Sequence, residues 1–202
     1  MPTETEKSKK LQQLSRYEES LFRIDGDEIA VGYVKENIDR IWNRESVYLH
    51  GDYHPGNLIY TADCSIGVID FNRWKVGDPY EEFYKLESFG IENSIPYCIG
   101  QIDAYFDDCI PEDFWSTLAV YVACSSLYSI KWAEKFGQDE VNRMAARCRR
   151  AFDDYDYFRT CRPKWYTDKY KKYFTDCINI RAASCFPNTF SIDKENDNKI
   201  HG

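Results

Sequence analysis

The chain has 202 residues, of which 43% are hydrophobic and 16% aromatic, enough for one domain with a sizeable core. Its formal net charge of −8 argues against nucleic-acid binding, and its apolar runs fall short of the ~20 residues that a membrane-spanning helix needs. Its eight cysteines include no Cys-x-x-Cys pair, and no secretory signal opens the chain, so we expect reduced thiols in a cytoplasmic protein.

The region before His50 is expected to be helical after a flexible start. Residues 1–14 are polar and charged and are predicted to be flexible. Apolar residues recur at helical spacing over residues 11–24, and Ile38 and Ile41 indicate a second helix. We expect both helices to pack against the rest of the domain.

Short extended segments rich in β-branched, aliphatic and aromatic residues follow, and they predict strands at residues 46–49, 58–60 and 66–69. Pro55 and Gly56 are unfavourable in a helix, so the residues between the first two segments form a loop. The second and third segments are separated by a turn and predict a hairpin. Such a hairpin returns Asp70 towards Asn57.

The remainder of the chain predicts helices. A helix with an acidic outer face is expected around Phe83, a short helix near Ile102, the most apolar helix over residues 114–136, and another from Gln138. That last helix carries a basic strip, which we expect to pair with nearby acids rather than with nucleic acid: Arg143, Arg147, Arg149 and Arg150. Residues 187–202 are predicted to be a disordered tail.

One loop combines the residue types needed for phosphoryl transfer. It reads His50-Gly51-Asp52-Tyr53-His54-Pro55-Gly56-Asn57, and Ile69-Asp70-Phe71 follows. Phosphoryl transfer needs a carboxylate to take or orient the hydroxyl proton, and amide and carboxylate oxygens to hold magnesium. Asp52 suits the first role, and Asn57 and Asp70 suit the second. The step from Asp52 to Asn57 equals that between Asp and Asn in the protein-kinase catalytic loop.

A zinc hydrolase is the main alternative for this loop. His50 and His54 stand four residues apart, a spacing that places two imidazoles on one metal when the segment is helical. The glycines and the proline of the loop argue against a helix. A hydrogen-bonded, structural role for His50 remains open beside the phosphoryl-transfer reading.

These segments closely resemble the aminoglycoside phosphotransferase and choline kinase superfamily. Its signature is His-Gly-Asp-x-His-x-x-Asn, then Ile-Asp-Phe or Ile-Asp-Trp, then Gly-Asp-Pro, which here is Gly77-Asp78-Pro79. The resemblance implies an α+β, mostly helical fold, the C-terminal lobe of a protein-kinase-like fold with a small catalytic hairpin. The lobe would span residues 15–186, with the catalytic loop at 50–57, the metal-binding segment at 69–71 and a helical acceptor subdomain at 80–175.

The resemblance also implies roles for individual residues. Asp52 would be the catalytic base, and Asn57 and Asp70 would bind Mg²⁺. His50 and His54 would brace the loop, and Asp78 would cap the following helix. Where the family often carries Asp three residues after the proline, this chain has Glu82, whose role the sequence leaves open.

The implied activity is transfer of the γ-phosphoryl group of ATP, or GTP, to a hydroxyl of a small molecule. Many acceptors of the family are cationic, so an acidic cluster could help to bind one: Asp153, Asp154 and Asp156. No glycine-rich phosphate loop precedes His50. We therefore expect the chain to be the C-terminal lobe alone, as a fragment, a truncated gene product or part of a split enzyme. The alternative is a catalytically incompetent binding module derived from such a kinase.

Overall fold

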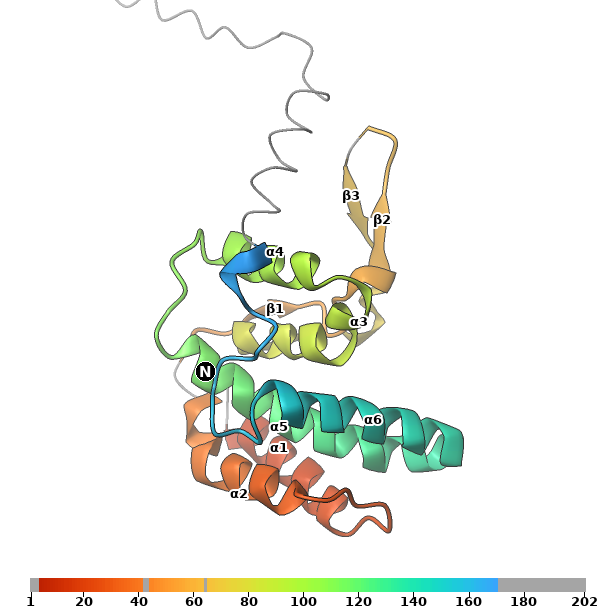
Figure 1. Ribbon diagram of the computed structural model, residues 1–202. Coiled ribbons are helices and arrows are strands. Elements are labelled where there is room, and N and C mark those ends of the chain that lie inside the picture. Colours follow the sequence, from red (N-terminus) through yellow and green to blue (C-terminus); the bar gives the residue numbers. More distant parts are fainter. Residues whose placement is uncertain (1–3, 42–43, 64, 171–202) are drawn as a thin grey trace, which may run out of the picture.

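A computed structural model describes residues 4–41, 44–63 and 65–170 of the chain. The longer helices are α1 (Glu4–Glu18), α2 (Asp27–Asn37), α4 (Ile95–Tyr105), α5 (Phe114–Ala133) and α6 (Gln138–Asp154). Short helical turns are η1 (Ile38–Ile41), η2 (Pro55–Asn57), η3 (Phe71–Arg73), η4 (Pro79–Phe83), η5 (Leu86–Gly90), α3 (Ile91–Asn93) and η6 (Glu134–Phe136). The strands are β1 (Val47–Leu49), β2 (Leu58–Tyr60), β3 (Ile66–Val68) and β4 (Lys75–Gly77). Figure 1 shows this mostly helical arrangement, as expected from the sequence.

Helix α5 is the centre of the hydrophobic core. It contacts α1, α2 and α6, and side chains around its whole circumference are buried, as expected for an apolar helix enclosed by others. Full burial of one Leu or Phe side chain contributes about 1.5–3 kcal/mol. Helix α6 packs on α5 through an apolar stripe made of Val141, Met144, Cys148 and Phe152. Both helices begin where the sequence predicted, and α5 ends at Ala133, with the short turn η6 over the rest of the span predicted to Phe136.

The start of the chain differs from the expectation. Residues 4–14, expected to be flexible, belong to helix α1, in which Leu14 and Tyr17 are almost fully buried. Lys10 is buried as well, and its ammonium lies 2.8 Å from the Glu81 carboxylate. This partner is 71 residues away in the sequence, so local composition does not reveal it. The tail predicted at residues 187–202 lies outside the described residues.

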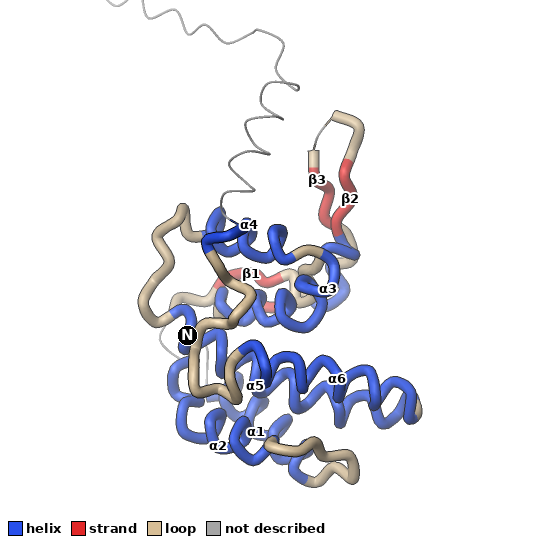
Figure 2. The backbone as a smooth tube through the Cα atoms, in the orientation of Figure 1, coloured by secondary structure: helices blue, strands red, loops and turns tan. Residues whose placement is uncertain are grey.

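The strands form two small antiparallel sheets, and Figure 2 shows the hairpin of β2 and β3 projecting from the helical body. Strands β2 and β3 make the predicted hairpin, with Leu58 opposite Val68. Strand β1 pairs with β4, a partner that the sequence did not predict, and Tyr48 lies opposite Val76. Strand β4 has only three residues, too few for a recognisable alternation of apolar and polar side chains.

The segment around Phe83, which we expected to be a helix with an acidic outer face, has a different structure. Residues 79–93 form a chain of short turns, η4, η5 and α3, of which η5 is a π-helix. Two of its acids, Glu81 and Glu87, are buried rather than exposed. A Cβ on Gly90 would lie 2.6 Å from the Cys98 sulfur, so glycine permits the close contact with α4. Helix α4 is longer than the short helix expected near Ile102, because it begins at Ile95 and runs through Gly100.

Three arginines of the basic strip on α6 form ion pairs with acids of the same chain, as predicted. Their partners are not the acids that directly follow the strip in the sequence. Arg143 pairs with Glu140 on the same helix. Arg147 and Arg150 both reach Glu92, with nitrogen–oxygen distances of 2.7 and 2.8 Å. Hydrogen bonds from Arg147 lower the pKa of Glu92 to about 2. Among the described helices, none combines the length and apolar character needed to cross a membrane.

Glu87 is a buried acid whose ionisation should destabilise the fold. The Trp165 indole N–H donates to Glu87 Oε2 over 2.7 Å, and the Arg150 guanidinium lies 3.8 Å from Oε1. Burial, reinforced by the neighbouring Asp154 carboxyl, raises the pKa of Glu87 to about 8. Burial likewise raises the pKa of the nearby Cys98 thiol, so that thiol stays neutral. Because the folded-state pKa exceeds the unfolded one, the stabilising contribution of Glu87 is complete below about pH 4.5 and is lost as pH rises towards 8.

Replacing Glu87 by Gln should therefore make the protein less sensitive to mildly alkaline pH. We expect the difference in unfolding free energy between Glu87→Gln and the parent to shift in favour of the variant as pH rises from 5 to 9. Urea titrations at several pH values measure it, and the exposed Glu112→Gln serves as control. Parallel pH profiles for Glu87→Gln and the parent would show that Glu87 does not titrate in this range.

Candidate active site

The loop after β1 is held in one shape by His50 and Gly51. His50 Nε2 donates to the Ile69 carbonyl over 2.8 Å, and its Nδ1 accepts from the Asp52 N–H over 3.2 Å. Gly51 has φ +78°, and a Cβ there would lie 2.1 Å from the Arg73 carbonyl oxygen, so glycine is required. With both ring nitrogens engaged, His50 braces the loop and has none left for zinc. The described residues contain no cluster of three or more His, Cys, Asp or Glu side chains that could hold a metal.

His54 supports the second half of the loop. Its Nδ1 accepts from the Gly56 N–H over 3.1 Å, so it caps the short turn η2. Its ring packs against Phe89, with centroids 5.6 Å apart. Burial lowers the pKa of His54, which favours the neutral imidazole needed for this acceptor role.

Asn57 and Asp70 lie next to each other where the hairpin begins and ends. The Ile69 N–H donates to the Asn57 carbonyl over 3.0 Å, which places Asp70 directly beside Asn57. The Asn57 amide nitrogen donates to the Asp52 carbonyl over 2.9 Å, so its amide oxygen is left as the atom for a metal. Asp70 adopts the left-handed conformation, φ 63° and ψ 57°, and Asn72 donates to its Oδ1 over 2.7 Å. Asp tolerates this conformation better than most residues.

The Asp52 carboxylate is held by a buried cation. The Lys85 ammonium lies 2.7 Å from its Oδ1, and the exposed Arg73 guanidinium lies 3.8 Å from its Oδ2. Burial alone would raise the pKa of Asp52, but Lys85, together with Arg73 and His54, lowers it below its ordinary value. Asp52 is therefore ionised at neutral pH and can accept a hydrogen bond from a hydroxyl group.

Glu82 anchors the loop on both sides of Asp52. Its Oε2 accepts from the Gly51 N–H over 3.0 Å, and its Oε1 accepts from the Tyr53 N–H over 3.1 Å. This is the position whose role the sequence left open. Glu82, Lys85 and Phe89 follow one another at steps of three and four, the spacing of one helical face. This spacing could have indicated that the three side chains face the loop together, but the acids of the segment were predicted to be exposed to solvent.

Asp78 connects the segment 79–93 to the core. It is fully buried, and its Oδ1 accepts from the Tyr80 N–H over 2.9 Å, which is the expected helix cap. Arg44 Nε donates to Oδ1 over 3.1 Å, and the Tyr121 hydroxyl donates to Oδ2 over 2.9 Å. Burial raises the pKa of Asp78 in spite of these donors.

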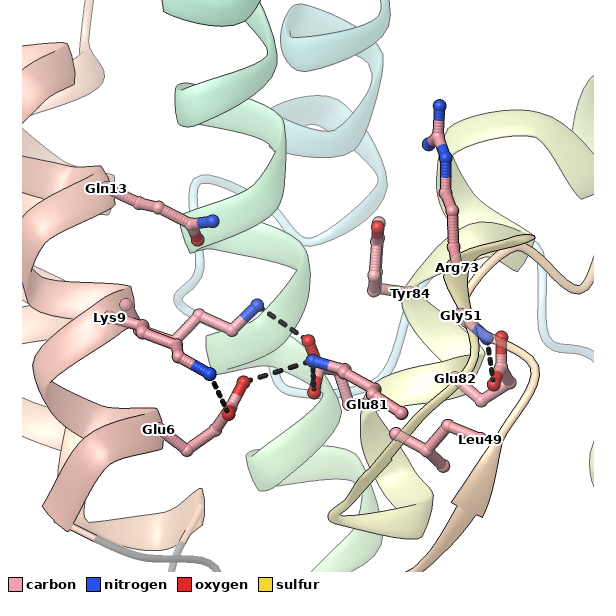
Figure 3. A pocket seen from close by; sticks show the side chains of 11 residues that line it. Glu6, Lys9, Gln13, Leu49, Gly51, Arg73, Glu81, Glu82 and Tyr84 are labelled. Atoms are coloured by element: carbon pink, nitrogen blue, oxygen red, sulfur yellow. Dashed lines mark hydrogen bonds and ion pairs between the residues drawn. The ribbon is translucent and has the colours of Figure 1, made fainter. Parts of the chain in front are cut away.

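A charged cavity of about 280 Å³ lies between α1 and the loop. Figure 3 shows Glu6, Lys9 and Gln13 of α1 on one side and Arg73 and Gly51 on the other. Its floor is an ion-pair network, in which the Glu81 carboxylate lies 2.8 Å from Lys10 and 2.7 Å from Lys75. Burial alone would raise the pKa of Glu81, but these two ammonium groups lower it to about 2. The network joins α1 to strand β4 and to the segment 79–93.

The acids considered for acceptor binding lie at the C-terminal end of α6. Asp153 is exposed, Asp154 adjoins the buried Glu87, and Asp156 lies 3.6 Å from Arg159. Helix α6 contacts η5, whereas β1, which precedes the loop, contacts η4. The contacts of the described residues do not bring Asp153, Asp154 or Asp156 together with Asp52.

The donor set at the loop fits magnesium. The Asn57 amide oxygen and the Asp70 carboxylate are hard oxygen donors, which Mg²⁺ prefers, whereas zinc sites in proteins are built mainly from Cys and His. The backbone bonds that join Asn57 to Asp52 and to Ile69 hold these groups in one small region. The arrangement suits a reaction in which a metal-bound phosphate meets a hydroxyl near Asp52.

Comparison with known proteins gives one result at the level of family. No curated protein and no solved structure matches the chain significantly. The model of the phosphotransferase enzyme family matches residues 4–119, a stretch that contains the loop, the hairpin and the Gly-Asp-Pro segment. Because the match covers more than half of the chain, the protein belongs to the phosphotransferase enzyme family.

Proposed function

We propose that this chain is the acceptor-side lobe of an ATP- or GTP-dependent kinase that phosphorylates a hydroxyl of a small molecule. The observation that carries the proposal is the arrangement of Asp52, Asn57 and Asp70 around one loop and one hairpin end, in a member of a phosphotransferase family. Phosphoryl transfer depends mostly on positioning and on neutralising charge. A rigid loop with an ionised carboxylate and two oxygen ligands meets both needs.

In this proposal each residue of the site has a defined task. Asp52 accepts the hydrogen bond of the acceptor hydroxyl and takes its proton as the new oxygen–phosphorus bond forms. The bond between the γ-phosphorus and the bridging oxygen breaks, and the nucleoside diphosphate leaves. Asn57 and Asp70 would hold Mg²⁺, which when bound neutralises charge on the phosphate oxygens. Glu82, His50 and His54 keep the loop backbone fixed, so little reorganisation is needed during the reaction.

The nucleotide needs a second lobe, which we propose is formed by residues other than these 202 and covers the loop. The described residues before the loop form α1, α2 and η1, and their sequence contains no glycine-rich phosphate loop. The strands around the loop, and Trp74 just before β4, expose large apolar side chains, with Tyr48 82%, Ile66 62% and Trp74 61% accessible. Exposed apolar surface next to a site is typical of an interface. We call the chain together with this lobe the complete enzyme.

The acceptor is proposed to be a small alcohol, with cationic compounds such as aminoglycosides and amino alcohols as the first candidates. The net charge of −8 supports this choice, because the field of an acidic protein attracts cations. Asp153, Asp154 and Asp156 remain a proposal for acceptor binding.

Two measurements test the proposed function. Transfer of labelled γ-phosphate from Mg-ATP and Mg-GTP is measured with the complete enzyme and a panel of aminoglycosides, amino alcohols and polyols. We expect a phosphorylated alcohol that forms only when Mg²⁺ is present. Calorimetric titration with the same compounds tests the alternative binding module. Acceptor binding without any nucleotide binding or transfer would favour the module and contradict the kinase.

A further inference from the structure

Lys85 is a buried cation whose carboxylate partner is the proposed base. Its side chain is 5% exposed, and its ammonium lies 2.7 Å from Asp52 Oδ1. Of the carboxylates in the described part of the chain, only that of Asp52 lies within 4 Å of this ammonium. The rings of Tyr84 and Phe89 lie 5.1 and 5.2 Å from it, which adds cation–π attraction and excludes water. Lys85 thus has little freedom to leave Asp52.

The loop does not need Lys85 to keep its backbone in place. The Gly51 and Tyr53 N–H groups are bound by Glu82, the Asp52 N–H by His50, and the Asp52 carbonyl by Asn57. Each of these contacts holds the backbone, and none holds the Asp52 carboxylate. The contact with Lys85 therefore acts on the side chain alone.

Two other basic side chains lie near Asp52, and neither can replace Lys85. The Arg73 side chain is 62% exposed and lies 3.8 Å from Oδ2, so water screens it and its side chain remains mobile. His54 Nε2 is 4.0 Å from Oδ1, and the lowered pKa of this imidazole keeps it neutral. Lys85 is the close, buried charge at the site.

We propose that Lys85 is a positioning residue for Asp52, a role that rests on the proposed function. Its ammonium binds Oδ1 and so fixes the rotation of the carboxylate, which leaves Oδ2 to receive the acceptor hydroxyl. Lys85 acts through Asp52. Lys85, Glu82 and Phe89 lie on one face of the segment 79–93, and through these side chains the segment supports the catalytic loop.

Kinetics of the complete enzyme with Lys85→Met test the proposal. A misoriented carboxylate should lower kcat by about 10²-fold, since small displacements of a reacting group have effects of this size. KM for Mg-ATP should change little, because Lys85 does not contribute to ground-state binding of the nucleotide. Lys85→Arg should recover part of the lost turnover by restoring a cation. Lys35→Met removes an exposed lysine that pairs with Glu18, and it should leave turnover unchanged.

The test separates this inference from the proposed function through Asp52→Asn, assayed beside the lysine variants. If Asp52→Asn is inactive and Lys85→Met retains full turnover, the role of Lys85 is excluded. If both retain full turnover, the assignment of Asp52 as the base fails and the role of Lys85 fails with it. If the parent itself transfers no phosphate, the proposed kinase function fails. A positioning role would also be contradicted if kcat were as low in Lys85→Arg as in Lys85→Met. The same holds if Lys85→Met changed KM and left kcat unchanged.

A readout without catalysis covers the case in which Lys85→Met folds poorly. The ammonium of a lysine in a buried ion pair exchanges its protons slowly and gives a nitrogen–proton NMR signal. We expect this signal for Lys85 in the 202-residue chain and its loss in Asp52→Asn. A signal that persists unchanged in Asp52→Asn would show that Asp52 is not the partner of Lys85, and the proposal would fail.

Discussion

Asp52→Asn is expected to lower the turnover number of the complete enzyme by roughly 10²–10⁴-fold, the range typical of removing a general base. Asn is nearly isosteric with Asp, but its amide cannot take up the hydroxyl proton and does not attract the Lys85 ammonium as a charge does. Thermal unfolding should show that the variant remains folded, because the loop backbone is held by Glu82 and His50. Initial rates at saturating Mg-ATP and acceptor give the comparison.

Asp139→Asn is the matched control for this measurement. It makes the same chemical change at an exposed position in the first turn of α6, away from the loop. We expect its turnover to equal that of the parent. Equal turnover in Asp52→Asn as well would exclude Asp52 as the base and with it the mechanism proposed here.

Asp78→Ala is expected to be the most destabilising single substitution that the site suggests. It removes the acceptor of the Tyr80 N–H, the Arg44 guanidinium and the Tyr121 hydroxyl at once, in a fully buried place. Breaking a buried ion pair by removing one partner costs about 3–5 kcal/mol. In a chain of this size that corresponds to a fall in Tm of roughly 6–20 °C, since each kcal/mol shifts Tm by a few degrees.

Asp113→Ala isolates the effect of burial. Asp113 also binds Arg44, over 2.9 Å, but its side chain is 57% exposed. Its removal should cost less than about 1 kcal/mol, as for other exposed ion pairs. Calorimetric scans of both variants and of the parent make the comparison. Similar Tm values for the two variants would mean that Asp78 does not connect the segment 79–93 to α5 as described.

The sequence predicted the elements whose signals are local. The hairpin of β2 and β3 follows from two β-rich segments on either side of a turn, and α5 from a long apolar stretch between Pro111 and Gly137. The loop between β1 and β2 follows from Pro55 and Gly56. In each case the residues that determine the structure are neighbours in the chain, so composition and spacing are sufficient evidence.

The errors lie where distant residues decide the structure. Residues 4–14 are polar enough to suggest flexibility, yet Lys10 is buried against Glu81, 71 positions away. The acids of the segment 79–93 suggest a solvated face, yet Glu82 binds the loop and Glu87 binds Trp165, 78 positions away. A charged side chain reads as exposed until its partner is known, because burial of a charge is tolerated only when it is paired.

For this protein the sequence by itself determined the family and indicated three oxygen-bearing side chains for the proposed site, since both inferences depend on residue types at fixed spacing along the chain. Only the tertiary structure decided how these side chains are held: the Lys85 ammonium on Asp52, the Glu82 carboxylate on the loop N–H groups, and Asp78 between Arg44 and Tyr121. Those contacts join segments far apart in the chain, and a buried ion pair exists only once packing has excluded water from both partners.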